Sequence, residues 1–379
     1  MPAYLDNAAT TKPCEEAVNA CLAAMTENYG NPSSLHKFGI NAELAVTEAR
    51  KAVAAALVCQ PECITFTSGA TEANNTLIFG AAQNYGRRKK RIVISAVEHP
   101  SVEEPVKILE NKGFEVVRIA PLKSGEIDAD EFLDAVNNDV FLVSCMMVNN
   151  ETGAVMPVKK IFTQIKKIYP EVITHCDAVQ GFLKYPIKTA DLNADLITVS
   201  GHKVHAPKGV GAMYIRKGIR IAPLLAGGGQ EKGLRSGTEA VPLISAFGAA
   251  VRKQLPEINT AFSNAEELNA RLRKKLSAFD YVTINSNAEN QSPYILNFSV
   301  KDIRSEIMLH FLESKGVYVS SGSACSKGAH SSVLTSMGIS DKTADSAIRA
   351  SFSKISSHGD IEALACAVQE GYLKLAKTR

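Results

Sequence analysis

Short apolar runs of strand length recur through the middle of the chain, separated by stretches in which apolar residues repeat with helical spacing. The apolar runs lie at residues 64–66, 92–94, 114–117, 140–143, 172–174 and 196–199. Helix-period stretches fill most of the intervals, for example 102–111 and 158–169. Strands that alternate with helices predict an α/β domain built around a largely parallel, buried sheet.

The pattern changes in the last third of the chain. A long amphipathic stretch covers about residues 239–279, and Pro242 and Pro256 are expected to divide it. The later strand-like runs, at 282–285, 294–300 and 347–352, are more widely separated, with helical stretches at 305–314 and 360–376. We therefore expect a large domain of residues 15–258 and a smaller α+β domain made of residues 1–14 and 259–379.

Composition narrows the class of protein. The chain has 379 residues, of which 45% are hydrophobic and 21% charged, and this balance excludes disordered and collagen-like classes. The net charge of +3 gives no reason to expect a nucleic-acid or membrane surface. The densest basic run, at 87–91, is interpreted as a solvated turn before a strand. A docking patch for RNA or an acidic partner is the alternative.

The cysteines and the N-terminal sequence indicate in which cellular compartment the protein is expected. No apolar run approaches the ~20 residues of a membrane helix, and no signal peptide is visible at the N-terminus. Eight cysteines in a chain of this length do not suggest a disulfide framework, so a reducing cytoplasm is expected. Cys59 and Cys63 have a metal-like gap but lack a second pair of ligands, so no metal is expected. Five others are interpreted as small buried hydrophobes: Cys14, Cys21, Cys145, Cys176 and Cys366.

A lysine and a carboxylate follow two of the strand-like runs. Lys203 ends the sequence Ser-Gly-His-Lys after the run 196–199, and Asp177 with Gln180 follows the run 172–174. Pyridoxal phosphate requires such a pair. The lysine amine forms a Schiff base with the cofactor aldehyde, and the carboxylate keeps the pyridine nitrogen protonated so that the ring accepts electrons.

Other polar clusters also end strands. Residues 67–72 follow one strand and open a helix, where backbone amides bind phosphate well; an ordinary helix cap at Thr71 is the alternative. His99 follows the run 92–94 and could stack on a flat ring and carry protons. Asn150 follows the run 140–143. In open α/β sheets ligands bind at the carboxyl ends of strands, so these clusters predict one shared site.

Two further residues suggest the substrate. Arg349 lies in the apolar run 347–352, and a buried guanidinium needs an anion, either a substrate carboxylate or an internal salt bridge. Cys325 lies in a small, Gly/Ser-rich run, Ser-Ser-Gly-Ser-Ala-Cys. A cofactor lysine and a cysteine in such a run together suggest chemistry on a sulfur-bearing amino acid.

These motifs resemble the cysteine desulfurases, a branch of the class V aminotransferase-like, fold-type-I pyridoxal-phosphate enzymes. The resemblance extends from Tyr4 to Arg349 and includes residues 4–11, 31–34, 67–72, 98–99, 148–151, 177–180, 200–203, 235–238 and 321–325. It implies a large domain with a mainly parallel seven-stranded sheet flanked by helices, and a small domain that carries the cysteine loop. The residues around Cys325 resemble the group with the longer cysteine loop.

The resemblance also implies a role for each site residue. Lys203 would hold the cofactor, Asp177 its pyridine nitrogen and Gln180 its ring hydroxyl, and His99 would stack on the ring and move protons. The phosphate would be bound by Ala70, Thr71, Ser200 and His202. Thr238 would reach the phosphate of a second subunit, which implies a homodimer, although it could instead cap the following helix. Asn150 and Arg349 would hold the substrate carboxylate.

The implied reaction converts L-cysteine to L-alanine. The sulfur would be held as a persulfide on Cys325 and passed to an acceptor protein for iron–sulfur cluster assembly or tRNA thiolation. Only 30 residues follow Arg349, whereas members that serve the general iron–sulfur scaffold usually carry a further C-terminal extension, and this leaves room for a dedicated acceptor such as a tRNA-thiolation enzyme. The alternatives are a selenocysteine lyase, a class V aminotransferase, or a catalytically silent sulfur-transfer subunit.

Overall fold

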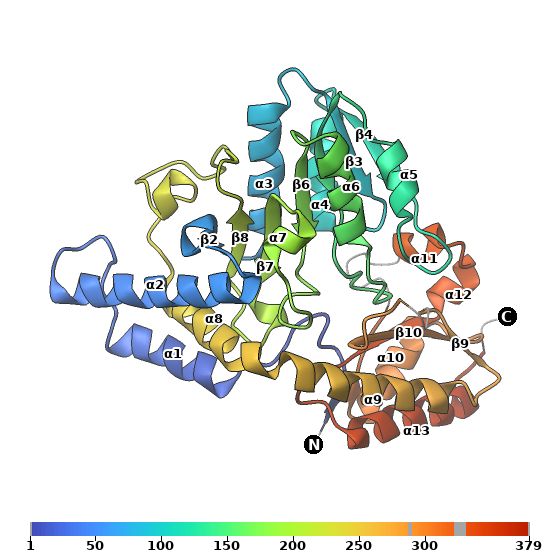
Figure 1. Cartoon of the computed structure of the whole chain (residues 1–379). Helices are drawn as coiled ribbons and strands as arrows, with labels where there is room; N and C mark the ends of the chain where they lie inside the picture. The colour runs from blue at the N-terminus through green and yellow to red at the C-terminus, as the bar shows by residue number, and fades with distance from the viewer. Residues whose placement is uncertain (1, 287–289, 322–330, 378–379) are drawn as a thin grey trace.

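A seven-stranded sheet forms the centre of the larger part of the molecule in a computed structural model that describes residues 2–286, 290–321 and 331–377 (Figure 1). Its strands are β2 (Ile64–Thr67), β3 (Arg91–Ser95), β4 (Glu115–Ile119), β5 (Val140–Ser144), β6 (Ile173–Asp177), β7 (Leu196–Ser200) and β8 (Gly211–Ile215). They follow the order β2-β8-β7-β6-β5-β3-β4, and every pair from β7 to β4 is parallel. The predicted mainly parallel sheet is therefore confirmed.

Strand β8 is the part of this sheet that the hydrophobic pattern did not single out. It runs antiparallel to both of its neighbours, β2 and β7. Only the short segment between Ser200 and Gly211 joins β7 to β8. A parallel return needs a crossover of a dozen or more residues, so this connection forces the antiparallel direction.

Helices cover both faces of the sheet (Figure 1). One face packs on α3 (Ala70–Tyr85) and α4 (Pro100–Glu110), and its buried cluster takes Ile92 and Ile94 from β3. The other face takes Val93 from the same strand and packs on α2 (Lys37–Leu57), α5 (Ala129–Asp134), α6 (Val158–Ile168) and α8 (Val241–Gln254). The alternation along β3 is that of a strand buried on both sides, as the apolar runs predicted.

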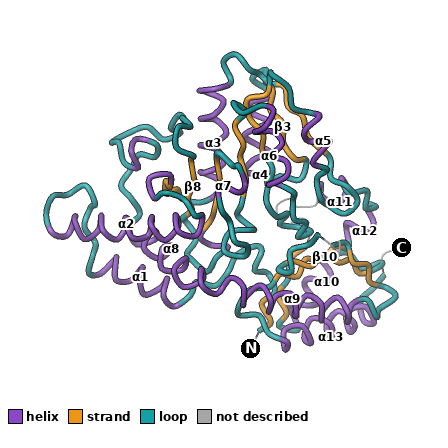
Figure 2. Tube along the Cα trace, viewed as in Figure 1, coloured by secondary structure: helices purple, strands orange, loops and turns teal. Residues whose placement is uncertain are grey.

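A second, four-stranded antiparallel sheet has its own core. Its order is β12 (Ser320–Ser321), β13 (Ala347–Ser351), β10 (Ile295–Val300) and β9 (Val282–Ile284). It packs on α9 (Ile258–Leu276), α10 (Ser305–Ser314) and α13 (His358–Lys374); α9 and α13 lie side by side in Figure 2. The N-terminal strand β1 (Ala3–Tyr4) pairs in parallel with β11 (Val317–Tyr318), far along the chain.

The division into residues 15–258 and 1–14 with 259–379 stays a prediction. One segment of the smaller part packs elsewhere: α11 (Ser332–Ser336) and the residues after it add Val333, Leu334 and Met337 to the core of the large sheet. Short helices α7 (Thr189–Leu192) and α12 (Asp341–Asp345) complete the connections. None of the helices in the described part of the chain is both long and apolar enough to cross a bilayer.

Three sequence interpretations need correction here. Pro256 does interrupt the long helical stretch, in the turn 255–257 between α8 and α9, but Pro242 lies in the first turn of α8 and divides nothing. Proline suits that position because the N–H that it lacks would be unpaired there. Cys366 is exposed on α13 and is not a buried hydrophobe, and Cys14 and Cys21 are only partly buried.

Candidate active site

A cavity of about 630 Å³ lies where the carboxyl ends of five strands of the large sheet meet the N-terminal segment and β13. Ten of the predicted site residues line it: Ala70, Thr71, His99, Asn150, Asp177, Gln180, Ser200, His202, Lys203 and Arg349. Of the predicted residues that the structure describes, only Thr238 does not line the cavity. Cys325 falls within residues 322–330, which lie outside the described residues.

The start of α3 can bind an anion. The helix begins at Ala70, and the residue before it is Gly69, whose φ of +156° suits glycine. Thr71 therefore lies in the first turn, and the alternative that made it the cap is wrong. The N–H groups of that turn and the helix dipole favour a phosphate. Ser200 adds a buried hydroxyl that lacks a hydrogen-bond partner among the described residues.

Asp177 is held by two donors at the end of β6. The Asn74 amide donates to Oδ2 at 2.9 Å, and the Val179 backbone N–H donates to Oδ1 at 3.0 Å. These two hydrogen bonds hold the carboxylate in one orientation at the wall of the cavity. Asn74 was not among the residues predicted from the sequence. A buried asparagine on α3, one turn beyond Thr71, was the available signal.

The N-terminal segment meets the candidate cofactor lysine. The amine of Lys203 donates to the carbonyls of Ala8 and Ala9, at 2.6 Å each. The amide of Gln180 donates to the same Ala8 carbonyl at 2.9 Å. Both carbonyl oxygens accept from the amine, so this arrangement fixes the position of Lys203 Nζ in the cavity. These carbonyls could not be predicted from the sequence, since backbone contacts between residues almost 200 positions apart leave no local pattern.

His99 starts α4 and has a fixed tautomer. Its Nδ1 accepts the Ser101 backbone N–H at 3.1 Å and lies 2.8 Å from the Ser101 hydroxyl. Because Nδ1 accepts, the proton of the neutral ring is on Nε2. Burial lowers the pKa of His99, and the charge of Lys203 adds to this, while Asp177 opposes it. The ring is therefore held neutral near neutral pH, with an N–H to donate.

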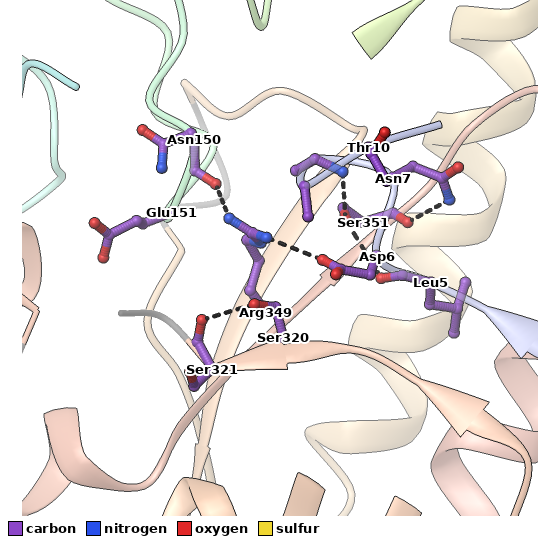
Figure 3. Close-up of polar contacts among 12 residues, drawn as sticks. Leu5, Asp6, Asn7, Thr10, Asn150, Glu151, Ser320, Ser321, Arg349 and Ser351 are labelled. Carbon is purple, nitrogen blue, oxygen red and sulfur yellow. Dashed lines mark hydrogen bonds and ion pairs between the residues drawn. The ribbon is translucent and has the colours of Figure 1, made fainter. Parts of the chain in front are cut away.

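Arg349 lies almost fully buried in β13, at the centre of Figure 3. Its guanidinium donates to the Asn150 carbonyl and to Asp6 Oδ1, at 2.9 Å each. The internal salt bridge that the sequence left as an alternative therefore exists. Nε remains buried without a partner among the described residues, so the guanidinium keeps donor capacity at the cavity wall.

Described residues on both sides of 322–330 contact residues of this site or their sequence neighbours. Ser320 pairs with Arg349 across β12 and β13. On the other side, the Ser331 hydroxyl donates to Glu151 Oε2 at 2.5 Å. Burial raises the pKa of Glu151 to about 7, and Arg349 and the Ser331 hydrogen bond oppose that rise. Ser320 and Ser321 therefore lie beside the proposed carboxylate anchor (Figure 3), and Ser331 contacts Glu151, which follows Asn150 in the sequence.

Thr238 is exposed at the end of a firmly held loop. Arg50 forms two 2.7 Å hydrogen bonds with Glu231 in this loop, and Arg235 donates to Glu72 at 2.9 Å. Helix α8 begins at Val241, with Ala240 as its N-terminal cap residue. The alternative role of Thr238 as the cap of that helix is therefore wrong.

Comparisons with known proteins agree on one family. Residues 3–364 match the model of the aminotransferase class-V family. A cysteine desulfurase of Trichormus azollae is 40% identical over 362 residues, which are 95% of this chain and 90% of that protein. A solved structure named NIFS-like protein has a TM-score of 0.94 at 36% identity and covers 99% of this chain and 100% of its own. A structure named "SspA in complex with cysteine" has a TM-score of 0.82 at 31% identity, covering 92% of this chain and 98% of its own. Sequence, fold and cavity together place the chain in the cysteine desulfurase family, within the class V aminotransferases.

Proposed function

We propose that this chain is a cysteine desulfurase that converts L-cysteine to L-alanine and leaves the sulfur as a persulfide on Cys325. The observation that carries the proposal is that one cavity gathers an amine, a carboxylate and a buried guanidinium: Lys203, Asp177 and Arg349. These are the groups needed for a cofactor aldehyde, a pyridine nitrogen and an amino-acid carboxylate. The similar structure named "SspA in complex with cysteine" supports L-cysteine as the substrate.

Class V aminotransferases and cysteine desulfurases depend in general on pyridoxal phosphate, and the residues here fit it. The first turn of α3 and the unpaired Ser200 hydroxyl suit its phosphate, with His202 beside them. Asp177 suits its ring nitrogen, Gln180 its ring hydroxyl and Lys203 its aldehyde. When bound, the cofactor supplies an electron-accepting ring that weakens the Cα–H and Cβ–S bonds of an attached amino acid.

The chain's own groups then perform the reaction. Arg349 and Asn150 orient the substrate carboxylate, and the Lys203 amine removes the proton from Cα. His99, neutral with its proton on Nε2, can donate to the substrate beside the ring. The Cys325 thiolate forms a bond to the substrate sulfur as the Cβ–S bond breaks. In balance, L-cysteine and the Cys325 thiol give L-alanine and a Cys325 persulfide.

Product analysis tests the activity. The purified protein with L-cysteine and a thiol reductant is expected to release alanine and sulfide in equal amounts. A keto acid in place of alanine would identify an aminotransferase. Release that needs selenocysteine, or that proceeds unchanged in Cys325→Ser, would identify a selenocysteine lyase. A protein without any cofactor absorbance would identify the catalytically silent subunit.

Arg349→Ala is expected to weaken cysteine binding with the cofactor retained. One charge-assisted contact is worth about 2–3 kcal/mol, so the apparent KM should rise roughly 30- to 150-fold. Arg349→Lys keeps the charge but not the planar fork and should recover only part of the loss. Arg304→Ala, on an exposed arginine paired with Asp345, is the matched control and should not change KM. An unchanged KM in Arg349→Ala would exclude this role.

A homodimer is part of the proposal. Thr238 is exposed and lies outside the cavity of its own chain, which suits a residue that reaches the phosphate in a second copy. Exposed apolar side chains also gather on α1 (Glu15–Thr26), on the loop after it and at the start of α2: Val18, Leu22, Met25, Tyr29, Leu35 and Phe38. Leu35 is 96% exposed in the single chain. A second copy would remove this apolar surface from water.

Mixed dimers test the shared site. Lys203→Ala and Thr238→Ala proteins are combined under conditions that exchange subunits. If Thr238 acts across the interface, the mixed dimer has one site with both defects and one site with neither. Activity should then rise toward roughly half that of the unaltered dimer. If mixed dimers form and their activity never exceeds that of the parents, Thr238 does not serve the other subunit's site.

The sulfur acceptor is proposed to be a protein, either a tRNA-thiolation enzyme or an iron–sulfur scaffold. The cytoplasmic location stays a prediction.

A further inference from the structure

Lys184 is a buried lysine that the proposed reaction does not use. It follows β6 closely, in the segment that also carries Gln180, and its side chain is only 8% exposed. No salt bridge to it is found among the described residues. Its amine lies 5.5 Å from the centroid of the Tyr294 ring, and the charges that shift its pKa are those of Lys203 and Arg349, both cationic. Burial and these two charges lower its pKa to about 7. Burying an amine without a carboxylate partner is costly, so other contacts must compensate for its burial.

The hydrogen bond of Lys184 to Gln180 indicates what this buried amine does. The Lys184 amine donates to Gln180 Oε1 at 2.9 Å, while Gln180 Nε2 donates to the Ala8 carbonyl at 2.9 Å. The protonated Lys184 amine can only donate, and the Ala8 carbonyl can only accept. If the Gln180 amide were flipped, its NH2 group would face the Lys184 ammonium and its oxygen would face the Ala8 carbonyl, and neither pair could form a hydrogen bond. Both neighbours therefore impose the same orientation on Gln180.

We propose that Lys184 is a positioning residue that locks the Gln180 amide with its NH2 group toward the cofactor ring. This inference rests on the proposed function, in which Gln180 serves the ring hydroxyl. Nε2 has two hydrogens, of which the Ala8 carbonyl takes one. The other is left for the ring oxygen. Lys184 thus acts on the cofactor through Gln180, from a small adjoining cavity that His205, Glu257 and Lys354 also line.

The predicted effect is on how firmly the cofactor is held and on how it titrates. The Gln180 NH2 group and the proton on the lysine–cofactor nitrogen compete for the same ring oxygen. Without an oriented Gln180, that proton is held more firmly, so the visible absorption band should titrate at higher pH. One neutral hydrogen bond gives a shift of roughly 0.3 to 1 pH unit and a loss of cofactor affinity of roughly 2- to 10-fold.

Lys184→Met tests this in the loaded enzyme by optical titration and by the cofactor dissociation constant. Methionine fills similar space without a donor. Lys354→Met is the matched control, because it removes an amine from the same small cavity while Lys354 pairs with Glu257 and not with Gln180. The control should behave as the unaltered protein. In a Gln180→Leu background, Lys184→Met should add less than half of its shift, because its route to the ring is gone.

An unshifted band and unchanged affinity in Lys184→Met would overturn the inference, as would an equal shift in the Gln180→Leu background. If Lys184→Met holds no cofactor, Lys184→Gln is the deciding variant, because glutamine keeps an N–H donor at this position. Recovery of the absorption band in Lys184→Gln supports the inference, and no recovery overturns it. A failure of the proposed function looks different. The unaltered protein itself would then show no band from a cofactor bound to Lys203.

Discussion

Lys203→Ala is expected to abolish both the bound chromophore and the activity. The amine is the only group proposed to hold the cofactor covalently, and it is also the base that removes the Cα proton. Loss of a positioned general base alone costs about 10² to 10⁴ in rate, so sulfide release should fall by roughly 10³-fold or more. The loss is expected to come from chemistry and not from unfolding, because the Lys203 side chain lines the cavity, where its amine donates to the Ala8 and Ala9 carbonyls.

Borohydride reduction and peptide mapping check the assignment. In the unaltered protein the label should fall on Lys203. Lys208 lines the same cavity but is exposed, and Lys208→Ala is the matched control. It should keep the label on Lys203 and keep the absorption band. A label on Lys184 or Lys208 in the unaltered protein would show that the cofactor lysine has been assigned wrongly.

Cys325→Ser is expected to separate cofactor binding from sulfur transfer. The cofactor and cysteine should bind as before, because their proposed contacts lie on other residues. The sulfur then has no thiolate to attack it. Loss of a catalytic nucleophile costs several orders of magnitude in hydrolases, so sulfide release should fall roughly 10³-fold.

Cys366→Ser is the matched control for this prediction. Cys366 is exposed on α13, so it is as open to small thiols as a carrier would be, but it lies on a helix packed on the smaller sheet. The control should keep full activity. If Cys366→Ser lost sulfide release while Cys325→Ser kept it, the persulfide carrier would be a cysteine other than Cys325.

The local pattern predicted most of the sheet and most of the cavity wall. Parallel strands point their carboxyl ends to one edge, so Thr71, His99, Asp177 and Lys203 could be grouped from the strand runs alone. The same logic failed where a connection was too short for a helix, as between β7 and β8. Strand direction there is set by the length of the connection and not by apolar spacing.

Contacts between segments that are distant in the chain could not be predicted from the sequence. The Ala8 and Ala9 carbonyls meet Lys203 through backbone atoms, which have no residue signature. The Asp6–Arg349 pair joins two residues separated by most of the chain. The role of Lys184 depends on which end of one amide faces it. In each case a tertiary contact, and not a propensity, decides what the residue does.

The most direct test of the account is mass spectrometry of the peptide that contains Cys325, after brief incubation of the loaded enzyme with L-cysteine in the absence of reductant. The account predicts a peptide heavier by one sulfur atom at Cys325, with one alanine formed for each persulfide. The same extra mass should be absent in Lys203→Ala. Alanine formed with an unmodified Cys325, or sulfur found on a different cysteine, would contradict it.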